Sequence, residues 1–100
     1  MFRIRELVIS PSQEDHMWVK HRVTTREVDE CCGEALLVIR GREEGFAIFG
    51  KTAAGRFLVL FVYPRGNGTF VLATARDLTQ TERRRVRGLT PRDLYDDEEE

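Results

Sequence analysis

Four β-rich segments follow one another along the middle of the chain, and they constrain its fold more than any other feature. Each combines β-branched and aromatic residues, and Gly-containing turns of hairpin size separate them. Strands joined by such short turns lie side by side and run antiparallel. The sequence therefore predicts an antiparallel sheet built from residues 35–39, 45–50, 56–63 and 68–75.

Three capping boxes mark helix starts on either side of these strands. In each box a Ser or Thr is followed three residues later by Gln or Glu, as in Ser10–Gln13, Thr24–Glu27 and Thr79–Glu82. They predict a helix over about residues 11–21, a second that ends near Gly33, and a third that Gly88 closes. With a first strand in residues 2–9, the order β-α-α-β-β-β-β-α predicts an α+β domain. Its helices are expected to pack on one side of a twisted antiparallel sheet.

Length and composition favour one small intracellular domain. A chain of 100 residues supports one modest core, so we expect a single domain over residues 1–95 and an acidic, disordered tail over 96–100. No apolar run approaches the ~20 residues of a membrane span, and the N-terminus does not read as a signal peptide. A cytoplasmic protein with no membrane partner is therefore expected. Cys31 and Cys32 are adjacent and match no zinc pattern, so they are predicted to be core or helix-end residues.

Charge is distributed unevenly along the chain, although the formal net charge is only −1. Residues 51–92 hold nine basic and two acidic side chains, a local charge of +7, whereas residues 93–100 hold six acidic side chains and no basic one. The basic segment predicts a positive surface that attracts polyanions. The acidic end is expected to be solvated, and the alternative is that it imitates nucleic acid and covers the arginines.

The most informative stretch for function is residues 71–86. Here an apolar strand ends in Arg76 and leads into a helix that opens with Glu-Arg-Arg-Arg at 82–85. Cleavage of an RNA phosphodiester requires a group that takes a proton from the 2′-hydroxyl and cations that stabilise charge on the phosphate oxygens. A carboxylate set among guanidinium groups could supply both. A surface patch of salt bridges is the alternative interpretation.

This stretch resembles the C-terminal signature of the BrnT-type toxins, which belong to the RelE-like group of small bacterial ribonucleases. The likeness rests on the strand ending Ala-Thr-Ala-Arg-Asp at 73–77 and the Glu-Arg-Arg that follows a short turn. Residues 20–24 with Glu27-Val28 resemble the family's Lys-His-Gly-Val-Ser segment and second helix, and residues 55–62 resemble its central strand. The resemblance extends over roughly residues 16–87.

The resemblance implies a RelE-like fold, RNA cleavage without a metal or other cofactor, and a small ribbon-helix-helix antitoxin as partner. Carried over residue by residue, it implies catalytic roles for Arg76, Glu82 and Arg83. Contacts to RNA are expected from further basic residues, namely Lys20, His21, Arg84, Arg85 and Arg87. The oligomeric state of the free protein stays open, with a homodimer as one option.

Structural roles compete with these functional ones. Glu82 is the third residue of a capping box, where its carboxylate would bond the Thr79 amide, and this role alone explains the residue equally well. At about 100° per residue, however, Glu82 shares a helix face with Val86 and Leu89. The sequence therefore predicts that Glu82 points toward the sheet and pairs with Arg76.

The end of the first predicted helix offers similar alternatives. His21 is interpreted as a helix C-cap more than as a proton donor. Trp18 is interpreted as a core anchor more than as a platform on which a base stacks. Neither residue therefore carries the functional hypothesis alone.

The sequence departs from the BrnT pattern at three places. Arg22 stands where the family has Gly, so either the turn is rebuilt or Arg22 adopts a positive φ. Val86 replaces the tyrosine usually found four residues after the Glu, and the N-terminal Trp-Asp opening is absent. These departures bear on catalysis more than on the fold.

Three hypotheses follow. The first is a BrnT-like toxin of a type II toxin–antitoxin pair that cleaves RNA without a metal. The second is a catalytically silent module of the same fold that binds RNA or an antitoxin. The third is a plain interaction domain in which every charge is surface. The sequence contains no DNA-recognition motif, so any operator binding would come from the antitoxin.

Overall fold

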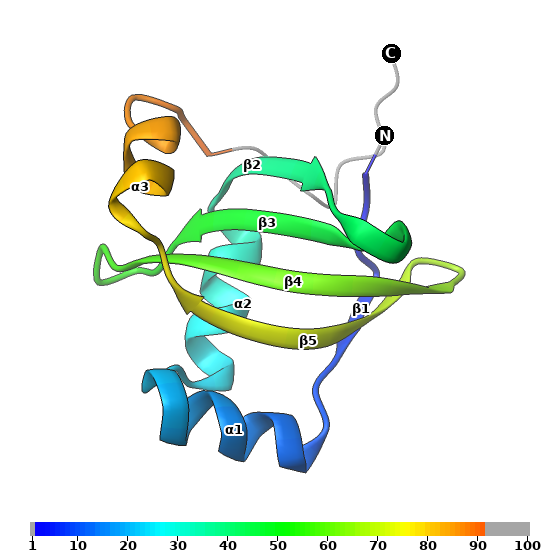
Figure 1. Ribbon diagram of the computed structural model, residues 1–100. Coiled ribbons are helices and arrows are strands. Elements are labelled where there is room, and N and C mark those ends of the chain that lie inside the picture. Colours follow the sequence, from blue (N-terminus) through cyan, green and yellow to red (C-terminus); the bar gives the residue numbers. More distant parts are fainter. Residues whose placement is uncertain (1, 92–100) are drawn as a thin grey trace.

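The computed structural model describes residues 2–91, and its elements follow the predicted order β-α-α-β-β-β-β-α. Figure 1 shows one sheet with helices lying against it. The helices are α1 (Pro11–His21), α2 (Thr25–Gly33) and α3 (Gln80–Val86), and the strands are β1 (Glu6–Val8), β2 (Ala35–Arg40), β3 (Phe46–Lys51), β4 (Phe57–Gly66) and β5 (Thr69–Asp77). A short 3-10 turn, η1 (Arg42–Glu44), joins β2 to β3. The expected acidic tail, residues 96–100, lies outside the described residues.

The sheet is mixed and has the strand order β1-β5-β4-β3-β2. Strands β2 to β5 pair antiparallel, as their short connections predict, and the β4–β5 turn places Asn67 and Gly68 at φ of 56° and 81°. The α+β class is confirmed, but β1 runs parallel to β5, which corrects the expectation of a purely antiparallel sheet. A short turn sets the direction only of strands that are adjacent in the chain, and β1 is separated from β5 by every other strand.

The two faces of the sheet are covered by different helices. Leu58 and Leu60 of β4 belong to a core cluster with residues of α1 and α2, whereas the intervening Val59 belongs to a second cluster with Leu78 and with Val86 of α3. Because successive side chains of a strand point to opposite faces, α3 lies on the other face from α1 and α2. The expectation that all helices pack on one side was therefore wrong for α3. Leu78, which packs into the second cluster, directs the chain to that face.

The helix ends follow the capping boxes. Thr24 Oγ1 accepts the N–H of Glu27 at 3.1 Å, and the Glu27 carboxylate accepts the N–H of Thr24 at 3.0 Å. Ser10 Oγ accepts the N–H of Gln13 at 3.1 Å. At the end of α1, Arg22 has a φ of 54° and a ψ of 43°, in the left-handed region. The chain thus keeps the glycine-type turn and accepts a strain of about 1 kcal/mol for a residue with a Cβ atom.

Cys31 and Cys32 are buried and free, as predicted for core residues of α2. Burial is the main cause that raises the pKa of each thiol to about 12, so both remain protonated and unreactive near neutral pH. The backbone of Cys31 approaches Gly50 of β3 so closely that a Cβ atom at Gly50 would collide with the Cys31 carbonyl. Helix α2 therefore packs directly on the backbone of β3.

Candidate functional site

Arg76 and Glu82 form a two-point ion pair across the turn between β5 and α3. Nη1 of Arg76 donates to Oε1 of Glu82 at 2.9 Å, and Nη2 donates to Oε2 at 3.0 Å. The same Oε1 accepts the N–H of Thr79 at 2.9 Å, while Thr79 Oγ1 accepts the N–H of Glu82 at 3.2 Å. Glu82 therefore caps α3 and orients Arg76 at the same time.

The pair is only partly shielded from solvent, with side-chain exposures of 31% for Arg76 and 23% for Glu82. Hydrogen bonds from Arg76 are the main cause that lowers the pKa of Glu82 to about 2, and the Thr79 amide adds to this while partial burial opposes it. The same bonds raise the pKa of Arg76. Glu82 is thus ionised at neutral pH with both oxygens occupied, and in this arrangement it is a weak proton acceptor.

A pocket of about 390 Å³ opens beside this pair. Its apolar lining includes Ala47, Phe49 and Phe61 from the α3 face of the sheet, and the Arg76 guanidinium lies 5.3 Å from the ring centroid of Phe61. Arg76, Glu82 and Arg85 all line this pocket. The predicted pairing of Glu82 with Arg76 therefore lies at a pocket that a further arginine of α3 also lines. We call this space the candidate pocket.

The other arginines of α3 lie elsewhere. The guanidinium of Arg83 sits 5.3 Å from the ring centroid of Phe57, and Arg83 lines a separate hollow of about 300 Å³ together with Arg87. Arg84 is exposed. The structure thus brings Arg85, and not Arg83, to the candidate pocket. Leu89 is 43% exposed, because α3 ends before it and the helical face predicted for it is not formed.

Lys20 and His21 are not brought to the candidate pocket. They end α1, which packs on the opposite face of the sheet through the fully buried Met17. Trp18 is 49% exposed, and the guanidinium of Arg22 lies 5.0 Å from its ring centroid. The expectation that Trp18 anchors the core was therefore wrong, because Met17 occupies the buried position of this narrow helix face.

Sequence reasoning missed a second arginine network, which we call the Arg56 cluster. Nε and Nη2 of Arg56 donate to the two carboxylate oxygens of Asp77 at 2.8 and 3.0 Å. Nη1 donates to Glu27 at 3.2 Å and to the carbonyl of Arg22 at 2.8 Å, and Nη2 donates to the carbonyl of His21 at 2.8 Å. The cluster ties the turn between α1 and α2 to the end of β5. No sequence motif indicates it, because the partners are remote in the chain.

Sequence reasoning also missed three residues of the candidate pocket. Arg40, Arg42 and Tyr63 line it, although residues 40–44 read in the sequence only as a separator between strands. A Cβ atom at Gly45 would lie 2.7 Å from the Tyr63 ring, so the glycine permits this ring to pack on the backbone. Tyr63 thus brings a phenol to the pocket. Position 86, where the BrnT pattern has a tyrosine, supplies none because it is Val86 here. Only the strand register could have revealed the place of Tyr63.

Two further findings concern the described part of the chain. Within residues 2–91, no group of three or more His, Cys, Asp or Glu side chains is arranged to hold a metal ion. In the same range no helix is long and apolar enough to span a membrane.

Fold and geometry together define a small α+β protein with the fold of a ribonuclease toxin. Among solved structures, the chain is similar to the Brucella abortus ribonuclease toxin BrnT, with a TM-score of 0.62 and 10% sequence identity. The match covers 75% of this chain and 97% of that chain. No family model and no curated protein sequence matches this chain. At this identity the likeness establishes the fold, so the resemblance seen in the sequence is confirmed at that level.

Proposed function

We propose that this chain is a BrnT-like toxin that cleaves RNA at the candidate pocket without a metal ion. The observation that carries the proposal is one pocket that Arg76, Arg85, Arg40 and Arg42 line together with the carboxylate of Glu82. The fold of a known ribonuclease toxin supports it. Guanidinium groups at a partly desolvated pocket stabilise charge on phosphate oxygens more strongly than they would in water.

The proposed reaction is attack of the RNA 2′-oxygen on the adjacent phosphorus. Glu82 takes the proton of the 2′-hydroxyl, the new P–O bond forms a cyclic phosphate, and the 5′-oxygen leaves with a proton from water. Arg76 and Arg85 stabilise the negative charge that gathers on the phosphate. The sequence also assigned a role to Arg83, which would have to swing away from the Phe57 ring to reach the phosphate.

The low pKa of Glu82 does not suit a base, but RNA itself would change it. A phosphate that binds Arg76 competes with Glu82 for the same guanidinium. Loss of these hydrogen bonds removes the main cause of the lowered pKa, so the pKa of Glu82 rises on binding. Substrate binding would thus free the carboxylate and make it a better proton acceptor at the same step.

We infer a small antitoxin of the ribbon-helix-helix class as the protein partner. The inference rests on the toxin fold and on the residues that resemble the BrnT family. A gene for such a protein next to the gene for this chain would support both the toxin and the silent-module hypotheses.

A catalytically silent module that binds RNA or an antitoxin is the second candidate. It is favoured by the full engagement of Glu82 with Arg76 and Thr79, and by Val86 in place of the tyrosine. In this case the ion pair only positions Arg76 for a bound phosphate. The fold and the basic pocket serve both candidates equally.

Inducible expression with growth and RNA integrity measured in parallel separates the two. The toxin hypothesis predicts growth arrest and RNA cleavage that persists with EDTA in a purified reaction. The Arg76→Ala variant, expressed to the same level, is the matched control and should permit growth. Wild-type protein that leaves RNA intact and cells growing would decide for the silent module.

A further inference from the structure

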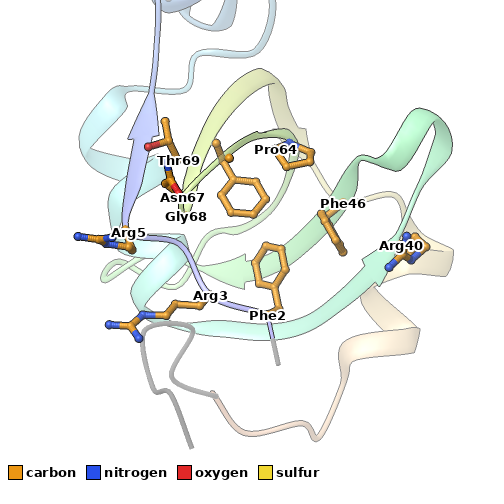
Figure 2. Close-up of a pocket in the computed structure, with 11 residues that line it drawn as sticks. Phe2, Arg3, Arg5, Arg40, Phe46, Pro64, Asn67, Gly68 and Thr69 are labelled. Atoms are coloured by element: carbon orange, nitrogen blue, oxygen red, sulfur yellow. The ribbon is translucent and has the colours of Figure 1, made fainter.

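A second hollow continues from the candidate pocket around the end of the sheet. It has a volume of about 580 Å³ and is formed by the segment before β1, the start of β3 and the β4–β5 turn. Arg40 and Phe46 line both spaces, so the two meet at these residues. Figure 2 shows Phe2 and Phe46 in the middle of the hollow, with Arg40 on one side and Arg5 on the other.

The lining of the two spaces is strongly basic. It contains Arg3, Arg5, Arg40, Arg42, Arg76 and Arg85. Among the described residues that line these two spaces, Glu82 is the one carboxylate, and it is already bonded to Arg76. Glu6 lines a smaller recess beside Arg5, and Glu43 and Glu44 lie in η1. These three acidic residues therefore flank the two spaces without lining either of them.

The hollow also offers apolar ring surface. The rings of Phe2 and Phe46 are only partly buried and lie 4.6 Å apart, and Phe70 lies 5.2 Å from Phe2. The Arg40 guanidinium is 5.5 Å from the Phe46 ring centroid. A simple anion has no flat apolar surface with which to contact these rings. A single-stranded nucleotide presents a phosphate and a flat face together, the combination that such sites bind.

We propose that this hollow is a second nucleotide subsite, into which a single-stranded RNA bound at Arg76 continues past Arg40. Arg5 and Arg40 each contact a different phosphate of the strand, and the exposed parts of Phe2 and Phe46 contact a base or ribose between them. The proposal rests on the proposed function, since it extends the strand bound there. It assigns the N-terminal segment to substrate binding rather than to the sheet alone.

The strand register sets the span of the two subsites. Arg76 is opposite Val59, Val59 is opposite Phe49, and Phe49 is three residues from Phe46. Two strand spacings and three residue rises separate Arg76 from Phe46 by about 14 Å. An RNA of about four nucleotides or more is therefore needed to fill both subsites.

The test compares binding of a two-nucleotide and an eight-nucleotide 2′-O-methyl RNA, which cannot be cleaved through its 2′-oxygen. Fluorescence anisotropy at several salt concentrations gives the affinity and its salt dependence. Arg5→Gln should weaken the eight-nucleotide RNA about tenfold and reduce the salt slope by about 0.7, the loss of one single-strand phosphate contact. The same variant should leave the two-nucleotide RNA unchanged.

Arg26→Gln is the matched control, because Arg26 is 88% exposed on α2 and its replacement changes the net charge by the same amount as Arg5→Gln. Arg5→Lys, which keeps the charge, should retain most of the affinity and guards against a packing effect, since the Arg5 stem lies on Gly68. If the eight-nucleotide RNA binds Arg5→Gln and Arg26→Gln equally, the second subsite is refuted and the proposed function still stands. If wild-type protein binds neither RNA, the proposed function fails and the subsite fails with it.

Discussion

Arg76 and Asp77 are neighbours in β5, yet each belongs to a different arginine–carboxylate network on a different face of the sheet. Asp77 is bound by Arg56, which uses all five of its N–H groups on protein acceptors. Arg76 donates three times, twice to Glu82 and once to the Asp77 carbonyl. Within residues 2–91, two of its five N–H groups therefore have no hydrogen-bond acceptor and face the candidate pocket.

This difference separates a structural arginine from a binding one. The hydrogen bonds to Asp77 are the main cause that raises the pKa of Arg56. Because all five of its N–H groups already donate to the protein, Arg56 has no donor for a ligand. The Arg76 network has a similar two-point pair, but it opens on a pocket lined by further arginines. Composition alone does not distinguish them, since both are strand-end ion pairs. The number of guanidinium N–H groups that already donate to protein acceptors distinguishes the two arginines.

The largest expected effect is on cleavage in Glu82→Gln. Gln still serves the capping box, so the fold and RNA affinity should be kept, but it is a far poorer base. Loss of a general base lowers the rate by on the order of 10²–10⁴-fold. Single-turnover cleavage of a labelled RNA measures this, with thermal melting as the control for folding. Unchanged cleavage in this variant would leave Glu82 with a capping role only.

Arg76→Ala should reduce cleavage by on the order of 10²–10³-fold, as expected for loss of one group that stabilises a developing anion. It should also weaken RNA binding, because Arg76 contacts phosphate in the ground state as well. Cleavage and affinity are measured on the same RNA. Arg26→Ala, which removes an arginine that is 88% exposed on α2, is the control for a general loss of charge. Equal losses in the two variants would mean that the pocket has no special role.

Arg56→Ala should act on stability instead. It removes the Arg56 donor from Asp77 and two carbonyls and leaves Glu27 only its bonds from Thr24, so we expect the free energy of unfolding to fall by about 2 kcal/mol. RNA affinity measured well below the melting temperature should not change beyond the effect of one charge. Chemical denaturation of this variant and of Arg26→Ala provides the comparison. A stable Arg56→Ala protein that fails to bind RNA would abolish the distinction drawn between the two networks.

A smaller effect is expected from pH. The pKa of Glu82 is lowered from its usual 4.5 to about 2 in the folded protein. As pH falls, the Glu82 carboxylate is therefore protonated in the unfolded chain before it is protonated in the folded protein, which favours unfolding. The stabilisation from Glu82 is therefore complete above pH 4.5 and is lost toward pH 2. Wild-type protein should exceed Glu82→Ala in unfolding free energy by about 1 kcal/mol at pH 6 and by less at pH 3. A difference that stays constant with pH would contradict this assignment.

Local features were predictable from the sequence because they depend on neighbouring residues. The capping boxes at Thr24 and Thr79 and the hairpin strands are of this kind, and so is the pairing of Arg76 with Glu82 across one turn. The side on which α3 packs was predicted wrongly, because the sequence was expected to place all helices on one face. The continuous apolar run at 57–62 in β4 is nevertheless typical of a strand buried on both faces.

The rest of the site depends on how remote segments come together. Arg40 reaches the candidate pocket only because β2, β3 and β4 are in one particular register. Arg56 finds its acceptors in a helical turn and in another strand. Trp18 was misassigned because size and hydrophobicity indicate a core position, whereas the helix had room to bury only Met17 on that face. Such features require the tertiary structure.

The smallest expected effect is on removal of the acidic residues 96–100, which takes five negative charges from the chain. A less negative protein attracts RNA more strongly, so affinity should rise by about two- to threefold at low salt. Ionic screening should erase the gain at about 1 M salt, where the Debye length is only about 3 Å. Replacing the same five residues with Asn and Gln keeps the length and should reproduce the gain, which separates charge from bulk. If neither variant changes affinity at any salt concentration, the acidic end is a solvated segment without influence on the pocket. If the gain instead persists at high salt, the tail competes through a specific contact, and the silent-module hypothesis would then have to include an autoinhibited state.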